Sequence, residues 1–469
     1  MIKPDVPFEI TDPERIPPQR YYSDVFFELE RERLWPHVWQ MACRLEQIQH
    51  VGDYIEYTNL GKSVIVVRTR DGVRAFHNAC RHRGVQLASG HGNCKQQGFI
   101  CPFHGWRWNI EGKNTFVYGR HLFSEHQLDP ADLALAPCRV EEWGGCAFIN
   151  LDDDAPPLLD YLGPVAEKLD KYQVGKLRAE WWYATELPAN WKIAMEAFME
   201  GYHTMRTHPQ LHNVAPALFA GMYGQDTGGV GSPANPNLSV RDNILAQVEL
   251  MRRLSEGMAG MCHAKDLETA EGLVDVDLPD DPNQAVMAWY GLLGAEVVRQ
   301  GRARGEPTPD LNALAASDPA RGVEYLFPHY FLLPYLSSFS AYRVRPLGPE
   351  RCLFELWSLT LFPEGAEPEP VLEPVVLPHD SPRFPPIPQQ DYANIPRQQI
   401  GLHAEGFEFM RLSRDIEGLI SNYQRVIDGY LRGDAADRVT RATASIGSTF
   451  DGPVIDLGLR AQTSAGSPQ

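Results

Sequence analysis

Short segments rich in β-branched and aromatic residues recur through the first third of the chain. They are Tyr54–Tyr57, Ser63–Arg68 and Val73–Phe76, and they are separated by the turn sequences Asn59-Leu60-Gly61 and Asp71-Gly72. This pattern predicts antiparallel strands joined by tight turns, and Gly145–Leu151 predicts one more strand. Between them, Asn78–Arg107 is rich in Gly, Cys and His without periodicity, which predicts a loop region. Apolar residues at helical spacing also predict a helix from a Ser23 cap to about Trp35.

The second half of the chain predicts another sheet and two further helices. Its strand-like runs are Glu180–Leu187, Ser337–Val344 and Cys352–Phe362. Helical patterns run from about Trp191 to Thr207 and from about Ser413 to Leu431. Ten prolines lie between Pro363 and Pro396, so we expect no regular element there and a path over the surface.

Acidic and proline-rich segments of the chain predict its domain boundaries. The acidic segment Asp152–Pro157 ends in prolines, and we place the main boundary there. We expect an N-terminal helical segment at 1–40 that packs on the second of two domains, which are placed at 41–155 and 156–450. Residues 451–469 form a tail, and its end, Ser464–Pro468, is expected to fray.

Composition excludes several classes of protein. The chain has 469 residues with 43% hydrophobic and 22% charged residues, which is typical of a soluble globular protein. Its formal net charge of −18 disfavours binding to nucleic acid and to anionic membranes. No apolar run reaches the roughly 18 residues of a membrane span, and no signal peptide is recognisable, so we expect a cytoplasmic protein.

Two Cys–His pairs stand in the loop region. Cys80-Arg81-His82 and Cys101-Pro102-Phe103-His104 are separated by eighteen residues. Two thiolates and two imidazoles suit a tetrahedral zinc or an iron–sulfur cluster in which two His replace two Cys on one iron. The glycines that follow each pair allow backbone N–H groups to approach sulfur, which tunes a redox cluster and has no such use at a structural zinc. Cys94 lies between the pairs, and we interpret it as a loop residue; the other five cysteines are expected to be buried.

A second group of possible ligands follows Trp191. Glu200 and His203 are three residues apart, which puts them on one side of a helix. His203 and His208 are five apart, about 140° around an ideal helix, so an unbroken helix could not direct both to one metal. Pro209 disfavours the helical conformation at His208 and is expected to free its imidazole. Two histidines with one distant carboxylate form the facial triad of non-haem Fe(II) oxygenases, although H-x(4)-H alone is a weak signal.

These motifs together resemble a known family. Cys80-Arg81-His82-Arg83-Gly84 and Cys101-Pro102-Phe103-His104-Gly105-Trp106 resemble the two halves of a Rieske [2Fe–2S] motif, which implies that the cysteines hold one iron and His82 and His104 the other. The segment Asn190–His208 resembles the iron-binding segment of Rieske non-haem iron aromatic-ring-hydroxylating oxygenases, α subunit. The resemblance implies that His203 and His208 bind a mononuclear Fe(II).

The resemblance also implies a fold and a role for Glu200. The expected fold is α+β, with an N-terminal Rieske β domain and a C-terminal helix-grip (START-like, SRPBCC) catalytic domain. Glu200 stands where most members carry an Asp that bridges the iron site to a Rieske histidine of a neighbouring subunit. Glu keeps the carboxylate but adds one methylene.

The third iron ligand is expected among the carboxylates near the C-terminus. Asp415 lies at the rim of the apolar stripe of the predicted helix, on the side of Leu419, whereas Glu417 and Asp428 fall on the polar side. Asp415 also precedes Gln424 by a spacing that resembles the family's final segment, so we predict Asp415 as the ligand. The alternative is that Asp415 only interacts with the helix dipole.

The resemblance implies the terminal oxygenase of a multicomponent system. A ferredoxin or a flavin reductase would load the cluster, and electrons would pass to the mononuclear iron. That iron would activate O2 to hydroxylate a small apolar substrate, which the family resemblance implies to be aromatic or polycyclic. Transfer between neighbouring subunits implies a homotrimer or an α3β3 assembly. Trp106 and Trp108 are candidates for the donor docking surface, or else core residues. The candidates for the substrate pocket are Phe198, Met199, Met205, Leu211, Phe219, Phe331, Leu333 and Phe339.

Two alternatives remain open at this stage. One is a non-catalytic Rieske electron carrier or hydrophobic-ligand-binding protein, and the other is a zinc-bearing structural protein. The histidine pair at 203 and 208 argues against the first, and the Cys–His pairing argues against the second.

Overall fold

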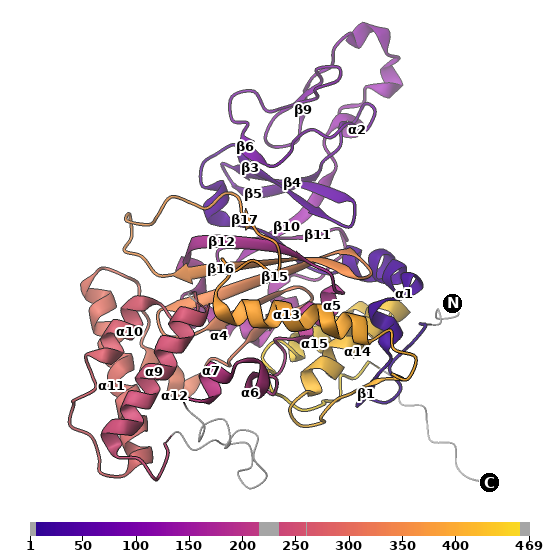
Figure 1. The fold of residues 1–469 in the computed structure, drawn as a ribbon. Coiled ribbons are helices and arrows are strands. Elements are labelled where there is room, and N and C mark those ends of the chain that lie inside the picture. Colours follow the sequence, from indigo (N-terminus) through magenta and orange to yellow (C-terminus); the bar gives the residue numbers. More distant parts are fainter. Residues whose placement is uncertain (1–5, 215–233, 259, 460–469) are drawn as a thin grey trace.

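Two sheets of different size organise the chain in the computed structural model, which describes residues 6–214, 234–258 and 260–459. The first belongs to a domain that protrudes from the body of the molecule, at the top of Figure 1. It has seven strands in the order β2-β11-β10-β5-β4-β3-β6. Their bounds are Gln40–Arg44 (β2), Asp53–Asn59 (β3), Lys62–Thr69 (β4), Gly72–His77 (β5), His91–Asn93 (β6), Pro137–Trp143 (β10) and Cys146–Asn150 (β11).

The tight turn predicted between the first two strands of this domain is present. Asn59 pairs with Lys62 across a two-residue connection. Leu60 and Gly61 both have positive φ, 48° and 75°, as a type I′ hairpin turn requires. A smaller sheet, with the order β7-β8-β9, extends the domain outward and consists of Phe99–Ile100, Arg107–Trp108 and Asn114–Phe116.

The second sheet forms the body of the molecule. Its six strands follow the order β13-β14-β15-β16-β12-β17. Their bounds are Arg178–Leu187 (β12), Glu324–Leu326 (β13), Tyr330–Pro334 (β14), Ser338–Gly348 (β15), Arg351–Thr360 (β16) and Val375–Val376 (β17). Helix α5 (Trp191–Glu196) packs on β15 and β16, and α13 (Pro386–Gly401) packs against α5 and β12. This α+β arrangement of two domains confirms the predicted fold class.

Further helices surround the second sheet (Figure 1). One group lies to one side and has its own apolar core, which includes Trp289 and Met251. That group consists of α9 (Val240–Met258), α10 (Ala264–Glu271), α11 (Pro282–Ala303) and α12 (Leu311–Ser317). The other elements are β1 (Arg15–Ile16), α2 (Pro130–Leu133), α3 (Leu158–Leu162), α4 (Pro164–Lys171), α6 (Thr204–Thr207), α7 (Pro209–His212), β18 (Met410–Arg411), α14 (Gly418–Arg432) and α15 (Ala436–Ser445).

The N-terminal segment packs on the body through buried polar contacts. Ser23 accepts a hydrogen bond from the N–H of Phe26 and so caps α1 (Asp24–Leu29), as predicted. Beyond α1 the segment forms a buried ion pair between Glu30 and Lys192 of α5, at 2.7 Å. Arg20 pairs in the same way with Asp428 of α14, at 2.6 Å. These pairs fix the segment against the two helices.

Two predictions about regular structure are wrong, and both concern the candidate iron site. The helix predicted from Trp191 to Thr207 ends at Glu196, and turns lead from there to α6 and α7. The proline-rich segment, predicted to lack regular structure, contains the sixteen-residue helix α13. Three of its prolines, Pro385, Pro386 and Pro388, occupy the N-cap and first turn, where N–H groups have no partner within a helix anyway.

Two further predictions concern the start of the last long helix and the C-terminal end of the chain. The helix predicted to begin at Ser413 begins at Gly418. The predicted frayed end at Ser464–Pro468 lies outside the described residues. Within the described part of the chain, no helix combines the length and the apolar character needed to cross a membrane.

Candidate metal sites

Two loops of the protruding domain present the first set of ligands in matching conformations. The N–H of Cys80 donates to the carbonyl of Val85, and that of Gly84 donates to the carbonyl of Cys80, at 2.8 and 2.9 Å. The second loop repeats both bonds, from Cys101 to Trp106 and from Gly105 to Cys101, at 2.8 and 3.0 Å. Gly84 and Gly105 have φ of 76° and 71°, a region that a side chain disfavours. The local sequence therefore encodes both loops.

The loops bring the four predicted ligands together. The Nδ1 atoms of His82 and His104 lie 3.1 Å apart. Two nitrogen ligands of one tetrahedral metal, with bonds of about 2.1 Å, lie about 3.4 Å apart. Cys80 and Cys101 are both buried, and their thiols interact with each other. The two sulfurs and two Nδ1 atoms therefore fit the predicted cluster with two ligands of each kind.

Backbone groups stabilise negative charge on the sulfurs. Burial raises the pKa of Cys101, but hydrogen bonds from the N–H groups of His104 and Phe103 outweigh it and lower the pKa below its usual value. The N–H groups of His82 and Arg83 act on Cys80 in the same sense, although burial keeps the pKa of Cys80 raised. Such N–H···S bonds favour thiolate ligands and tune a cluster's potential.

Cys94 and the two tryptophans have structural roles beside these loops. The thiol of Cys94 donates to the carbonyl of Gly52, at 3.3 Å, which agrees with its interpretation as a loop residue. The docking role considered for Trp106 and Trp108 is wrong, because both side chains are buried, at 3% and 0% exposure. Trp106 instead stacks on the ring of His82, with centroids 4.7 Å apart. An exposed aromatic residue next to the ligand candidate His104 is Phe103, at 59%.

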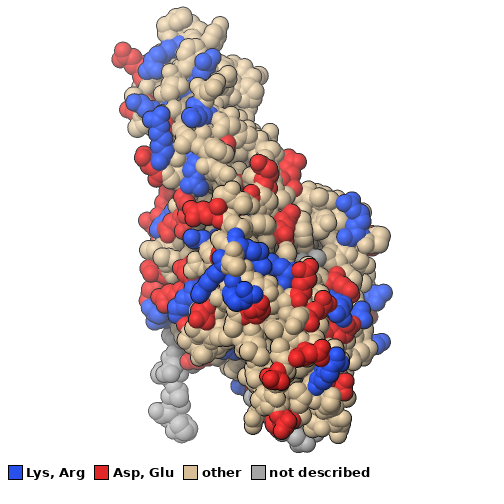
Figure 2. Space-filling view, turned by 90° about the vertical axis from the view of Figure 1, so that its left-hand side faces the viewer, with Lys and Arg blue, Asp and Glu red and all other residues tan. Residues whose placement is uncertain are grey.

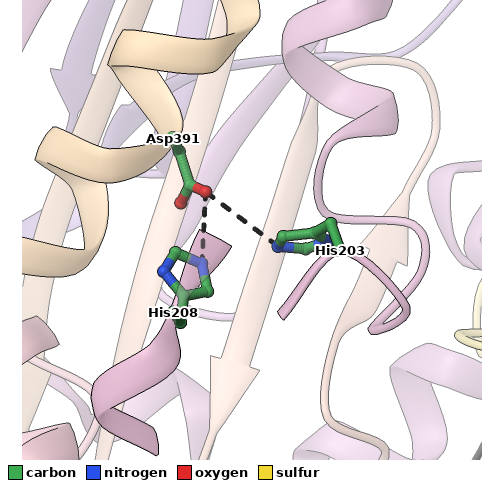
Figure 3. Close-up of side chains that lie close together, drawn as sticks. All are labelled: His203, His208 and Asp391. Carbon is green, nitrogen blue, oxygen red and sulfur yellow. Dashed lines mark ion pairs between the residues drawn. The ribbon is translucent and has the colours of Figure 1, made fainter. Parts of the chain in front are cut away.

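The second set of candidate ligands lies below the six-stranded sheet of the body, where α13 meets the segment of α6 and α7 (Figure 1 and Figure 3). Figure 3 shows the side chains of His203, His208 and Asp391 directed toward one another. Asp391 Oδ1 lies 3.2 Å from Nε2 of His208 and 3.9 Å from Nε2 of His203. One ligand atom from each of the three residues lies within 4.8 Å of the other two. Two imidazoles and one carboxylate form the donor set of a facial triad.

The other nitrogen of each imidazole is occupied by an acceptor. His203 Nδ1 lies 3.0 Å from Oε1 of Glu200, and His208 Nδ1 lies 2.7 Å from Oε1 of Gln390. With a proton on each Nδ1, both Nε2 lone pairs are free to bind a metal. The other oxygen of Asp391, Oδ2, is buried without a hydrogen-bond partner among the described residues, and a bound cation would satisfy it. The residues present therefore fit a mononuclear Fe(II).

Electrostatics at His203 reflect its acidic neighbours. Burial lowers the pKa of His203, but the hydrogen bond and charge of Glu200 and the charge of Asp391 outweigh burial and raise it. The predicted contact between Glu200 and His203 is present, yet a turn rather than a helix creates it: Glu200 Oε2 also accepts from the N–H of His203, at 2.9 Å.

The structure brings a different carboxylate to the histidines than the predicted Asp415. Asp415 is exposed in a turn before α14, and the described group of possible ligands around His203 and His208 does not include it. Asp391, 4% exposed and carried by α13, lies beside the histidines instead. The buried face of α13 includes Ile387, Asp391, Tyr392 and Ile395. That spacing is helical and was present in the sequence, but the surrounding prolines obscured it.

The break at His208 follows the predicted cause. Helix α6 ends at Thr207, His208 has φ −118° and ψ 61°, and Pro209 opens α7. The residue before a proline is excluded from the helical region, so the chain turns at His208 and directs its imidazole to Asp391.

Two protein-family models match the parts of the chain that contain these two sites. A family model described as the ring hydroxylating alpha subunit (catalytic domain) matches residues 174–433, more than half of the chain. The chain belongs to this family. A second model, the Rieske [2Fe-2S] domain, matches residues 38–117. The cofactors of this α subunit are accordingly a Rieske [2Fe–2S] cluster and a mononuclear iron.

Curated relatives of this α subunit are oxygenase subunits. The carnitine monooxygenase oxygenase subunit of Acinetobacter baumannii is 33% identical over 192 residues, which are 40% of this chain and 51% of that protein. The glycine betaine monooxygenase oxygenase subunit of Chromohalobacter salexigens is 31% identical over 198 residues, 42% and 44% of the two chains. The chain therefore spans about half the length of the curated relatives it matches.

Solved structures share the fold over nearly the whole chain. The apo form of the quaternary ammonium Rieske monooxygenase CntA aligns with a TM-score of 0.57 at 19% identity, covering 92% of this chain and 99% of that one. A naphthalene 1,2-dioxygenase variant bound to phenanthrene aligns with a TM-score of 0.59 at 19% identity, covering 93% and 96%. At this level of identity the likeness shows the fold alone.

A cavity of about 180 Å³ adjoins the triad of this α subunit. Of the predicted pocket residues, Phe198, Leu211 and Leu333 line it. Met199, Phe331 and Phe339 are buried in the core, Met205 is 37% exposed, and Phe219 lies outside the described residues. The other apolar residues of the lining are Leu254, Met258, Met261, Val323, Ile387 and Phe450. Polar side chains in the lining are those of the triad, Glu200 and Thr204, so the cavity offers apolar contact beside the metal ligands.

Proposed function

We propose that this α subunit is the terminal oxygenase of a multicomponent Rieske system. The observation that carries the proposal is the triad of His203, His208 and Asp391 at the wall of an apolar cavity, in a chain that also has the four Rieske ligands. When bound, the iron would supply the activation of O2 with electrons received through the cluster. Cys80, His82, Cys101 and His104 would hold the cluster.

The protein's own side chains have separable tasks in this proposal. Glu200 fixes the ring of His203 and remains 11% exposed at its side chain, so its carboxylate can accept a further hydrogen bond from outside the site. That bond would come from a Rieske histidine of a second copy. In Figure 1 strand β9 of the outer sheet lies in the protruding domain at the top, whereas α6 and α7 lie below the six-stranded sheet of the body. This separation supports transfer between subunits of a trimer.

The size and lining of the cavity favour the binding of a compact substrate whose reacting group is apolar. Leu, Met, Val, Ile and Phe side chains dominate its lining, and its acidic groups, Glu200 and Asp391, are engaged with the histidines. Such a lining favours an uncharged group such as a small aromatic ring. A second candidate class is quaternary ammonium compounds, because the relatives are named for carnitine and glycine betaine. Phe198 and Phe450 could contact the methyl groups of such a cation.

The electron donor would be a ferredoxin or a flavin reductase with an acidic face. From Ala79 to Leu133 the protruding domain has six Lys and Arg against four Asp and Glu, although the whole chain carries −18. Figure 2 shows that Lys and Arg predominate toward the outer end of this domain. Arg83 lies over the exposed ring of Phe103, next to the ligand His104. This positive surface beside the cluster complements an acidic donor.

The experiment that tests the proposal begins with metal content. Anaerobically purified protein should contain about three irons and two acid-labile sulfides per chain, with a Rieske-type EPR signal after reduction. About two irons to two sulfides, with no uptake of added Fe(II), would refute the oxygenase and favour a Rieske electron carrier. Iron-replete protein would then receive a surrogate reductase and a panel of substrates: naphthalene, indole, carnitine, glycine betaine and choline. Oxygenated aromatic products would support the first substrate class, and release of an N-substituent the second.

A further inference from the structure

The two histidines of the triad are held by chemically different groups. The Nδ1 atom of His203 faces the carboxylate of Glu200, whereas that of His208 faces the neutral amide of Gln390. A carboxylate is only an acceptor, so Glu200 admits one arrangement of the His203 proton. An amide has an acceptor end and a donor end, so its orientation decides which tautomer of His208 it stabilises.

A second glutamine pairs with Gln390 in both directions. Gln210 Nε2 donates to Oε1 of Gln390 at 2.9 Å, and Gln390 Nε2 donates to Oε1 of Gln210 at 3.0 Å. Gln210 follows His208 by two residues on α7, and Gln390 precedes Asp391 on α13. Both amides are partly buried. The pair therefore joins the two elements that supply the ligands, and neither amide can turn alone without breaking two hydrogen bonds.

The orientation of this pair has a direct consequence at the metal site. With Oε1 of Gln390 toward His208, the ring carries its proton on Nδ1, and the Nε2 lone pair faces Asp391. With the amide reversed, its NH2 group would donate to Nδ1 and the ring proton would move to Nε2. There it would be donated to Asp391 Oδ1, 3.2 Å away, and no lone pair would remain for a metal. Only the first arrangement is competent to bind iron.

We propose that Gln390, oriented by Gln210, is a positioning residue that holds His208 in its metal-binding tautomer. The inference rests on the proposed metal site, but it concerns residues outside the triad. Loss of a hydrogen-bond partner of this kind typically reduces metal affinity by about 10- to 100-fold. Because Gln390 acts through its acceptor oxygen, a carboxylate at the same position should replace it, whereas an apolar side chain should not.

Metal affinity of the mononuclear site provides the test. The Fe(II) dissociation constant would be measured by chelator competition on full-length protein with its Rieske cluster intact. Gln390→Leu should raise the constant by about 10- to 100-fold, and Gln390→Glu should stay close to the parent. Gln210→Leu should raise it by less, because Gln390 keeps its acceptor oxygen and loses only the partner that restrains its amide. Gln398→Leu is the matched control, an exposed glutamine on the same helix, and should change nothing.

The outcomes separate this inference from the proposed function. Unchanged affinity in Gln390→Leu would overturn the inference, and so would a loss in Gln390→Glu equal to that in Gln390→Leu. If the parent protein itself binds no metal that depends on His203, the proposed function fails instead. A measurement that needs no variant is selective ¹⁵N-histidine NMR of the zinc-loaded parent. In zinc-loaded protein the metal itself fixes this tautomer, so the deciding spectrum is that of the same protein after the zinc is removed. A ring proton on Nδ1 of His208 there supports the inference, and one on Nε2 overturns it.

Discussion

Glu196 of α5 is a buried carboxyl group whose ionisation should control stability near neutral pH. Its side chain is 4% exposed and accepts hydrogen bonds from the hydroxyl of Tyr21, at 2.9 and 3.0 Å, and from the amide of Gln424. Burial raises its pKa to about 7, even though those bonds and the charges of Lys192 and Arg20 act to lower it. The low-dielectric surroundings therefore outweigh the hydrogen bonds and nearby cations.

Glu196 holds its proton more tightly in the folded chain than in the unfolded chain. The unfolded carboxyl titrates near its ordinary value of 4.5, so between pH 4.5 and pH 7 the folded chain holds a proton that the unfolded chain releases. The free energy of unfolding therefore falls as the pH rises through this window. Each pKa unit corresponds to about 1.4 kcal/mol, so above pH 7 the free energy of unfolding is lower by about 3 kcal/mol than below pH 4.5. Below pH 4.5 this contribution is fully present.

Substituting Glu196→Gln should remove this pH dependence, because an amide resembles the protonated acid and never ionises. Thermal unfolding of parent and variant at equal metal loading would be compared from pH 5 to pH 8. Near pH 5 the two should melt within about a degree of each other. By pH 8 the variant should melt about 5 °C higher, since 3 kcal/mol is spread over the unfolding entropy of a catalytic domain of about 300 residues.

The matched control is Glu28→Gln, which neutralises a half-exposed glutamate paired with Arg31. Its melting temperature should differ from the parent by the same small amount at every pH, since exposed pairs contribute little. A difference between the parent and Glu196→Gln that stays constant from pH 5 to pH 8 would refute the reasoning. It would show that the cations around Glu196 compensate for its burial.

The remaining predictions concern the two metal sites. Asp391→Asn should weaken Fe(II) binding at the mononuclear site by at least about tenfold, whereas Asp415→Asn should leave it unchanged. Iron analysis, with the Rieske EPR signal as the measure of intact cluster, would show the difference. The reverse result would make Asp415 the third ligand. Glu200→Gln should retain both metals but slow electron transfer in single-turnover experiments, and an unchanged rate would exclude bridging. Cys101→Ser should abolish the Rieske EPR signal and Cys94→Ser should preserve it; loss of the signal in the second would make Cys94 a ligand.

The sequence predicted which residues come together at the first candidate metal site. These four residues belong to two short loops whose conformation is local, set by Gly84 and Gly105 at positive φ and by hydrogen bonds within each loop. The tight turn at Leu60-Gly61 and the Ser23 cap were predictable for the same reason. The ends of the predicted strands also lie within four residues of the observed ends. These features depend on neighbours in the chain.

Tertiary structure decided the rest of the second site. The chain itself fixed His203 and His208 as near neighbours, and Pro209 set the turn between their elements. The third member, Asp391, comes from a distant helix that its own prolines disfavour, including Pro396 in the interior. That helix forms because its apolar face packs against α5, α9 and β12, which outweighs intrinsic propensity. Local chemistry thus determined which groups could bind metal, whereas long-range packing determined which carboxylate faces the histidines.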